Sequence, residues 1–159
     1  MKNNKIYLSV FFIFLFNIIG AVALCFPSLR EAVLKLTPFN LLLILGMFLY
    51  ANNDFSLSFL KTILVVFIIG YFIEVLGVRF KFIFGEYYYG ETLGLKILNT
   101  PLIMGVNWLT LSVSTFGIAA YIFKPKILIV IAASVLMVLT DMLIEPISAS
   151  LDFWHWKNS

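Results

Sequence analysis

Long runs of apolar residues, separated by short polar connections, dominate the chain. A membrane-spanning helix needs roughly 20 predominantly apolar residues, and five runs reach or approach this length. We expect spans at residues 6–26, 38–50, 60–78, 101–123 and 127–147. Pro101 suits the first turn of the fourth span, because its missing N–H would have no partner there anyway. The pattern therefore predicts an all-α integral membrane protein, a single domain built as a bundle of about five transmembrane helices.

Composition supports this interpretation and narrows the partners. Of 159 residues, 62% are hydrophobic and only 12% are charged, with a mean hydropathy of +1.05, so a water-soluble fold could not bury the apolar surface. The net charge of +3 comes from Lys and Arg scattered at the ends of the apolar runs. These residues do not form a basic stripe, so nucleic acid is not expected as a partner. The expected partner is the lipid bilayer.

The longest connection, residues 79–100, contains the sequence FGEYYYG. Tyrosine rings favour the boundary between membrane and water. We expect this connection to lie along the interface, on the same side of the membrane as Trp154 and Trp156.

Three carboxyl groups fall inside the predicted spans, where an ionisable side chain costs about 2.5–3.5 kcal/mol near the centre. Glu74 and Asp141 lie past the middle of the third and fifth spans, each roughly 6 Å off centre at 1.5 Å per residue. These spans run in the same direction, so both carboxyls should share one half of the membrane and face the bundle interior. Glu145 follows Asp141 by one turn and lies nearer the surface.

The same end of the bundle collects aromatic and amide side chains. Glu74, Asp141 and Glu145 are the candidate catalytic residues. The candidate substrate-binding residues are Tyr87, Tyr89, Asn107, Trp108, Trp154 and Trp156. Structural explanations exist for all of them: buried carboxyls can be protonated hydrogen-bond donors, Glu145 can end a helix, amides can join helices, and aromatic rings can form an interfacial belt. The chain has one His and one Cys, so no metal site is expected.

Several of these stretches together resemble the membrane carotenoid biosynthesis proteins, a family that includes carotenoid end-group hydratases of the bisanhydrobacterioruberin and γ-carotene types. The stretches are EVLG from Glu74, FGEYYYG from Phe84, PLIMGVNW from Pro101, DMLIEP from Asp141, and WHW from Trp154. Family members continue through at least one further apolar helix after WHW, so the resemblance implies a bundle shortened at its C-terminus. It also implies a bacterial or archaeal cytoplasmic membrane and other carotenoid-pathway enzymes as partners.

The resemblance implies addition of water to the terminal C=C bond of an acyclic carotenoid or other long isoprenoid, giving a tertiary alcohol without any cofactor. The candidate residues suit this carbon–oxygen lyase chemistry. A carboxyl desolvated in the bilayer can hold a proton for the alkene, a second carboxyl can share that proton, and aromatic faces can stabilise the resulting cation. Asp141 or Glu74 is the expected acid.

Three other functions fit the same residues. A carotenoid end-group cyclase begins with the same protonation but lets an internal double bond capture the cation. Paired carboxyls in a membrane also occur in transporters and proton relays. A structural assembly subunit would tolerate neutral isosteres of the carboxyls.

Overall fold

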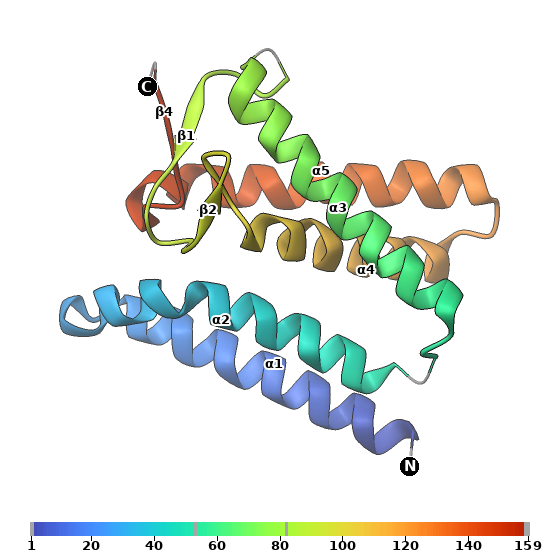
Figure 1. The fold of residues 1–159 in the computed structure, drawn as a ribbon. Helices are drawn as coiled ribbons and strands as arrows, with labels where there is room; N and C mark the ends of the chain where they lie inside the picture. The colour runs from blue at the N-terminus through green and yellow to red at the C-terminus, as the bar shows by residue number, and fades with distance from the viewer. Residues whose placement is uncertain (1, 53, 82, 158–159) are drawn as a thin grey trace.

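The computed structural model describes residues 2–52, 54–81 and 83–157 and contains five long helices (Figure 1). The helices are α1 (Lys2–Leu24), α2 (Pro27–Ala51), α3 (Leu57–Phe80), α4 (Ile103–Ile122) and α5 (Lys126–Ser148). All five are long and apolar enough to cross a membrane. The predicted all-α membrane bundle is confirmed.

Helix α2 is longer than the hydrophobic run that predicted it. It begins at Pro27, whose missing N–H suits the first turn, and it continues through Pro38 to Ala51. The prediction placed its start at Pro38 because Arg30, Glu31 and Lys35 interrupt the apolar pattern. Pro38 inside the helix removes one backbone hydrogen bond, which transmembrane helices tolerate when neighbouring groups compensate.

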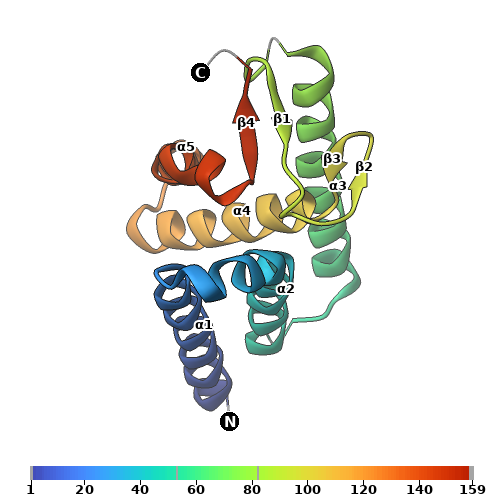
Figure 2. The same ribbon diagram turned by 90° about the vertical axis from the view of Figure 1, so that its left-hand side faces the viewer.

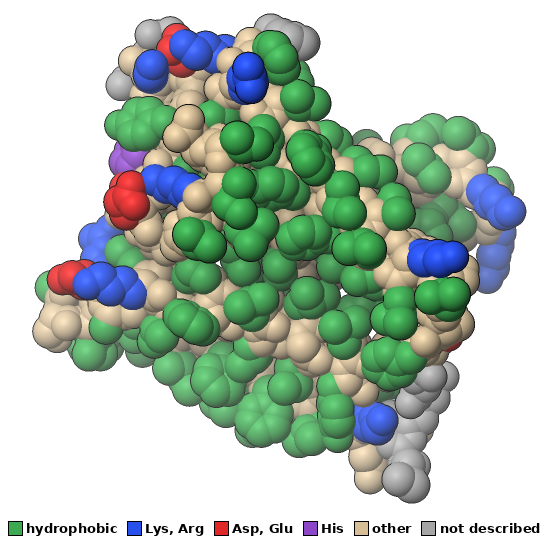
Figure 3. Space-filling model, viewed as in Figure 1, with side chains coloured by type: hydrophobic (Ala, Val, Ile, Leu, Met, Phe, Trp, Pro, Cys, Tyr) green, Lys and Arg blue, Asp and Glu red, His purple; other side chains and the backbone are tan. Residues whose placement is uncertain are grey.

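Helix α4 is the centre of the molecule. It packs against α3 and α5 on one side and against α2 on the other, while α1 packs mainly on α2 as an antiparallel hairpin (Figure 2). Leu109 and Ala119 of α4 are 1% and 0% exposed. The outer surface is apolar over the visible face, with charged side chains gathered towards its edges (Figure 3). This distribution matches a bundle surrounded by lipid.

Two glycines allow α3 and α4 to approach closely. A Cβ atom at Gly70 would lie 2.5 Å from the Cβ of Trp108, and one at Gly105 would lie 2.6 Å from the ring of Phe67. Membrane helices associate through such small residues, because lipid provides no hydrophobic drive for one helix to meet another. The Gly70 contact matters most, because it fixes the helix turn that carries Trp108.

The long connection after α3 forms short strands that the hydrophobic pattern did not predict. These are β1 (Tyr87–Tyr89), β2 (Lys96–Ile97) and β3 (Thr100–Pro101). After α5, a 3-10 turn (Ala149–Leu151) leads to a fourth strand, β4 (Trp154–Trp156). β1 pairs antiparallel with β4, and β2 pairs with β3. We call the β1–β4 pair the aromatic ribbon. It confirms that the connection lies beside Trp154 and Trp156.

Polar contacts at both ends of the aromatic ribbon hold its two strands together. Asp152 accepts backbone hydrogen bonds from Glu91 at 2.7 Å and Thr92 at 3.3 Å, and it contacts His155 at 2.8 Å. The bond from His155, together with the backbone donors, holds the pKa of Asp152 below its usual value. Only glycine fits at position 90, because a Cβ atom on Gly90 would overlap the backbone oxygen of Asp152.

At the other end, Glu86 accepts from Lys81 at 2.5 Å and Lys157 at 2.9 Å. These two bonds lower the pKa of Glu86 to about 2. The ion pairs therefore join the end of α3 to both strands of the ribbon.

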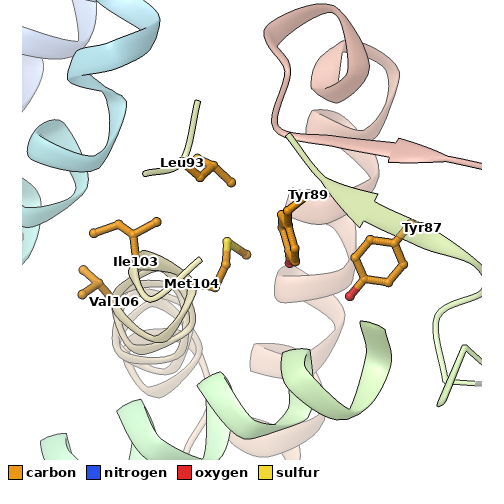
Figure 4. Packing of buried hydrophobic residues seen from close by; sticks show 6 residues of the cluster. All are labelled: Tyr87, Tyr89, Leu93, Ile103, Met104 and Val106. Carbon is orange, nitrogen blue, oxygen red and sulfur yellow. The ribbon is translucent and has the colours of Figure 1, made fainter. Parts of the chain in front are cut away.

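The inner side of the ribbon packs on the first turns of α4 and forms the main buried cluster (Figure 4). The cluster contains Tyr87, Tyr89, Leu93, Ile103, Met104 and Val106. Tyr71 of α3 adds a second anchor, since its hydroxyl donates to the carbonyls of Ile97 at 2.7 Å and Thr100 at 3.3 Å. The connection between α3 and α4 is thus fixed to both helices.

We predict that Gly70→Ala destabilises the bundle. The new Cβ would overlap the Cβ of Trp108, which cannot move without shifting the backbone of α4, and such overpacking typically costs about 1–3 kcal/mol. The midpoint of thermal unfolding of the protein in detergent micelles should therefore fall. Gly117→Ala in α4 is the matched control, because nothing lies within 4 Å of its added Cβ. Equal midpoints for the two variants would contradict the proposed α3–α4 contact.

Candidate functional site

Glu74 is the most enclosed carboxyl group of the bundle. Its side chain lies on α3 and the residue is only 6% exposed. One oxygen, Oε2, accepts hydrogen bonds from the hydroxyls of Tyr87 at 2.8 Å and Tyr89 at 2.6 Å. The other, Oε1, accepts from the indole of Trp108 at 2.7 Å. The prediction that Glu74 faces the interior is confirmed, and three donors compensate for its burial.

The alternation of the β1 strand explains why two tyrosines reach the same carboxyl. Residues two apart in a strand point to the same face, so Tyr87 and Tyr89 both point inwards, towards α3 (Figure 4). Tyr88 points the other way and stacks on His155, with 5.2 Å between the ring centroids. Gly77, one turn after Glu74, leaves room for the hydroxyl of Tyr87.

The two inward tyrosines remain neutral donors. Burial raises the pKa of both phenols well above the usual value, and the neighbouring charge of Glu74 raises them further. Each hydroxyl therefore keeps its proton and donates a hydrogen bond to the glutamate.

Glu145 has a comparable set of donors, supplied by the other strand of the aromatic ribbon. The indole of Trp154 donates to Oε2 at 3.2 Å, and the indole of Trp156 donates to Oε1. The residue lies in the last turn of α5 and is half-buried. Because β1 and β4 are paired, a single ribbon binds both glutamates, Glu74 through tyrosines and Glu145 through tryptophans.

Asp141 differs from its two neighbours because its side chain is exposed in this chain, whose α5 packs mainly on α4. That Asp141 faces the bundle interior stays a prediction. Among the residues that the structure describes, none makes a side-chain hydrogen bond to it. Glu145 and Glu74 are nevertheless close enough to interact with it electrostatically, as expected for carboxyls in the same half of the membrane.

The predicted site residues thus form two hydrogen-bonded groups, each around a glutamate, while Asp141 and Asn107 belong to neither group. Tyr87, Tyr89 and Trp108 surround Glu74, and Trp154 and Trp156 surround Glu145. Asn107 is half-buried beside Trp108, and in the described part of the chain its amide bonds to neither carboxyl.

The sequence did not reveal the residues that make room for the donors of Glu74 or hold the two strands of the ribbon together. Gly70 and Gly77 admit Trp108 and Tyr87, and Asp152 and His155 close the ribbon. The available signal was the spacing of the glycines along one face of α3, at positions seven apart, which is typical of a close helix contact.

The described residues contain no group of three or more His, Cys, Asp or Glu side chains placed to hold a metal ion. Two apolar cavities are lined by residues such as Phe48, Val113 and Ser114: one of about 420 Å³ lies between α2 and α4, and one of about 190 Å³ lies among α1, α2 and α4. None of the predicted site residues lines either cavity. The carboxyl groups and the aromatic ribbon therefore form the candidate site.

The arrangement combines three carboxyl groups with aromatic rings at one end of an apolar bundle, which suits proton transfer to an apolar molecule dissolved in the membrane. No curated protein and no solved structure matches the chain. A sequence profile of carotenoid biosynthesis proteins does match residues 36–159, a stretch that includes every carboxyl and aromatic residue of the site. The chain belongs to the carotenoid biosynthesis protein family.

Proposed function

We propose that this carotenoid biosynthesis protein adds water to the terminal double bond of an acyclic carotenoid, with Asp141 as the proton donor. The observation that carries the proposal is the contrast between Asp141 and its neighbours. Glu74 and Glu145 are occupied by hydrogen-bond donors, whereas none of the described residues donates to the exposed carboxyl of Asp141.

The reaction balances without a cofactor. The carboxyl proton of Asp141 adds to the less substituted carbon of the trisubstituted alkene, and the electron pair of the double bond forms the new C–H bond. The more substituted carbon becomes a tertiary carbocation. A water molecule then forms a C–O bond to this cation and releases one proton, leaving a tertiary alcohol.

Glu74 supports the cation rather than supplying the proton. Its two oxygens already accept three hydrogen bonds and are therefore occupied, and in the proposed reaction a negative charge on this carboxyl, in a low-dielectric site, stabilises positive charge that develops nearby. Aromatic faces add to this by roughly 2 kcal/mol each when desolvated.

The exposure of Asp141 also suits the substrate. A long polyene dissolves in the hydrocarbon core of the membrane, and an exposed carboxyl can meet it without a tunnel through the protein. Exposed apolar residues such as Val138 and Met142 flank Asp141 on this helix. The same reasoning extends to other long isoprenoids, and it lets a neighbouring pathway enzyme release the carotenoid directly into the membrane.

Expression in a bacterium that makes lycopene, followed by mass analysis of the pigments, tests the proposal. A carotenoid that has gained one or two molecules of water supports hydration. An isomer of unchanged mass would instead identify a cyclase, which the half-buried position of Glu145 near the membrane surface disfavours because water can reach it. Unchanged pigments would overturn the enzymatic proposal and favour transport or assembly.

We predict that Asp141→Asn abolishes the hydrated carotenoid while the amount of protein in the membrane stays nearly constant. The amide cannot donate the initiating proton, and general acid catalysis is typically worth about 10²–10⁴ in rate, so the loss should reach the upper part of this range. The side chain is exposed and bonds to no other side chain in the described part of the chain, so the fold should tolerate the change.

The matched control for Asp141→Asn is Asp54→Asn. Asp54 lies in the connection between α2 and α3, where its carboxylate accepts from the backbone N–H of Ser56. Its variant should produce normal hydrated carotenoid. Normal hydration by Asp141→Asn would show that another group is the acid.

We predict a smaller loss for Glu74→Gln, on the order of 10²-fold in hydrated product, because it removes a fixed charge rather than the proton donor. The amide can still accept from Trp108 and donate to the tyrosine hydroxyls, so the protein should accumulate. Glu31→Gln is the control, since Glu31 is exposed on α2 and pairs with Lys35. Pigment yield relative to membrane protein, measured by chromatography, distinguishes the two variants. An unchanged yield from Glu74→Gln would rule out the electrostatic role.

A further inference from the structure

We infer that Glu145 is the general base that activates the attacking water, and that Trp154 and Trp156 are the residues that position it. This assignment rests on the proposed hydration. It divides the three carboxyls into a proton donor, a fixed anion and a proton acceptor.

The hydrogen bonds of Glu145 favour the role of acceptor. An indole N–H can donate but cannot accept, so Trp154 and Trp156 require an acceptor on each oxygen of the carboxyl. Both oxygens therefore act as hydrogen-bond acceptors. The two bonds also fix the plane of the carboxyl group, so that the remaining lone pairs have a defined direction for binding water.

The spacing of Glu145 from Asp141 fits an acid and a base that act on one double bond. The two residues are four apart on α5, so they share a face with roughly 5–6 Å between their Cβ atoms. Glu145 lies close enough to Asp141 to interact with it electrostatically. A terminal alkene lying across this turn would place its less substituted carbon at Asp141 and its more substituted carbon towards Glu145.

The position of Glu145 along the helix supplies the water. Asp141 lies further inside the apolar span, while Glu145 lies in the last turn before the 3-10 turn and the aromatic ribbon. The polar groups beyond it, including Asp152 and His155, mark the end of the apolar layer. Water therefore arrives from the side of Glu145, and the carotenoid arrives from the side of Asp141.

In the second half of the reaction, Glu145 accepts a proton from water and passes it to Asp141. The oxygen of the bound water attacks the tertiary carbocation as its proton passes to a carboxylate oxygen of Glu145. The product is the tertiary alcohol, with Glu145 protonated and Asp141 ionised. Transfer of that proton from Glu145 to Asp141, directly or through one water, restores both groups for the next turnover.

Heavy water separates the two carboxyl roles. Membranes that contain the full chain are incubated with lycopene in deuterium oxide, and both the hydrated and the unhydrated carotenoids are analysed by mass. Protonation alone forms a deuterium-bearing cation, which can return to an alkene by losing a proton from a neighbouring carbon. Deuterium in unhydrated carotenoid therefore reports the acid step, and hydrated product reports the capture of water.

For Glu145→Gln we expect a loss of about 10²-fold in hydrated product, while deuterium still enters the unhydrated carotenoid. Asp141→Asn should lose both signals, because no cation forms. Glu145→Asp, which keeps a carboxylate, should recover part of the hydration. Glu31→Gln again serves as the control for the change of charge.

The tryptophans give a second test that does not alter the carboxyl. Trp154→Phe and Trp156→Phe keep a ring but each removes one N–H bond to Glu145. Each should lower the ratio of hydrated product to deuterated alkene several-fold. A purely structural defect would lower both signals together and leave the ratio unchanged. Tyr88→Phe, on the opposite face of the same ribbon, should leave the ratio and the total activity unaltered.

The outcomes separate failure of this assignment from failure of the proposed function. A wild-type protein that neither hydrates lycopene nor introduces deuterium would overturn the hydratase proposal itself. If the wild type is active, normal hydration by Glu145→Gln, or parallel loss of both signals in Glu145→Gln and in both tryptophan variants, would overturn the role of Glu145 alone.

Discussion

The cost of placing a carboxyl group inside an apolar bundle governs the rest of this structure. Glu74 is almost completely buried on α3, and such a group is tolerated only when hydrogen-bond donors surround it. Helices alone do not supply these donors, because their backbone groups are already paired. The chain provides them from a short ribbon, two of whose tyrosines reach across to Glu74, and from Trp108 on the central helix. The ribbon, the glycine contacts and the hydrogen bonds of Asp152 all help to place these donors around Glu74.

The helical part of this structure is predictable because lipid imposes a simple rule on sequence. A span must be apolar over its whole length, so composition alone identifies α1, α3, α4 and α5 with small errors at their ends. The start of α2 was missed for the same reason: its first turns carry Arg30, Glu31 and Lys35, and they are helical without being uniformly apolar. The ribbon was missed because its strands have three residues each and lie far apart in the chain, so nothing local marks their pairing.

The candidate site was likewise predictable in part: the sequence indicated which residues share one end of the bundle but not which of them bond to one another. Counting alternating helix directions was enough to bring Glu74, Asp141 and the aromatic residues to one end of the bundle. The hydrogen-bond partners depend instead on the register of β1 against β4 and on the close approach of α3 and α4 at Gly70, which are tertiary properties. The exposure of Asp141 depends on which sides of α5 are covered, and the residues of α5 carry little information about that. Burial and bonding, rather than position along the helix, distinguish the three carboxyls.

The alternation of the aromatic ribbon also makes the site sensitive to how β1 and β4 are aligned. A slip of one residue in their register would turn Tyr88 inwards and carry Tyr87 and Tyr89 to the outer face. Glu74 would then face one phenol in place of two. A slip of two residues would keep the alternation but would replace one of the two inward tyrosines by a residue from outside the strand. The alignment of the two strands, rather than the number of tyrosines in the connection, is therefore the property on which the enclosure of Glu74 depends.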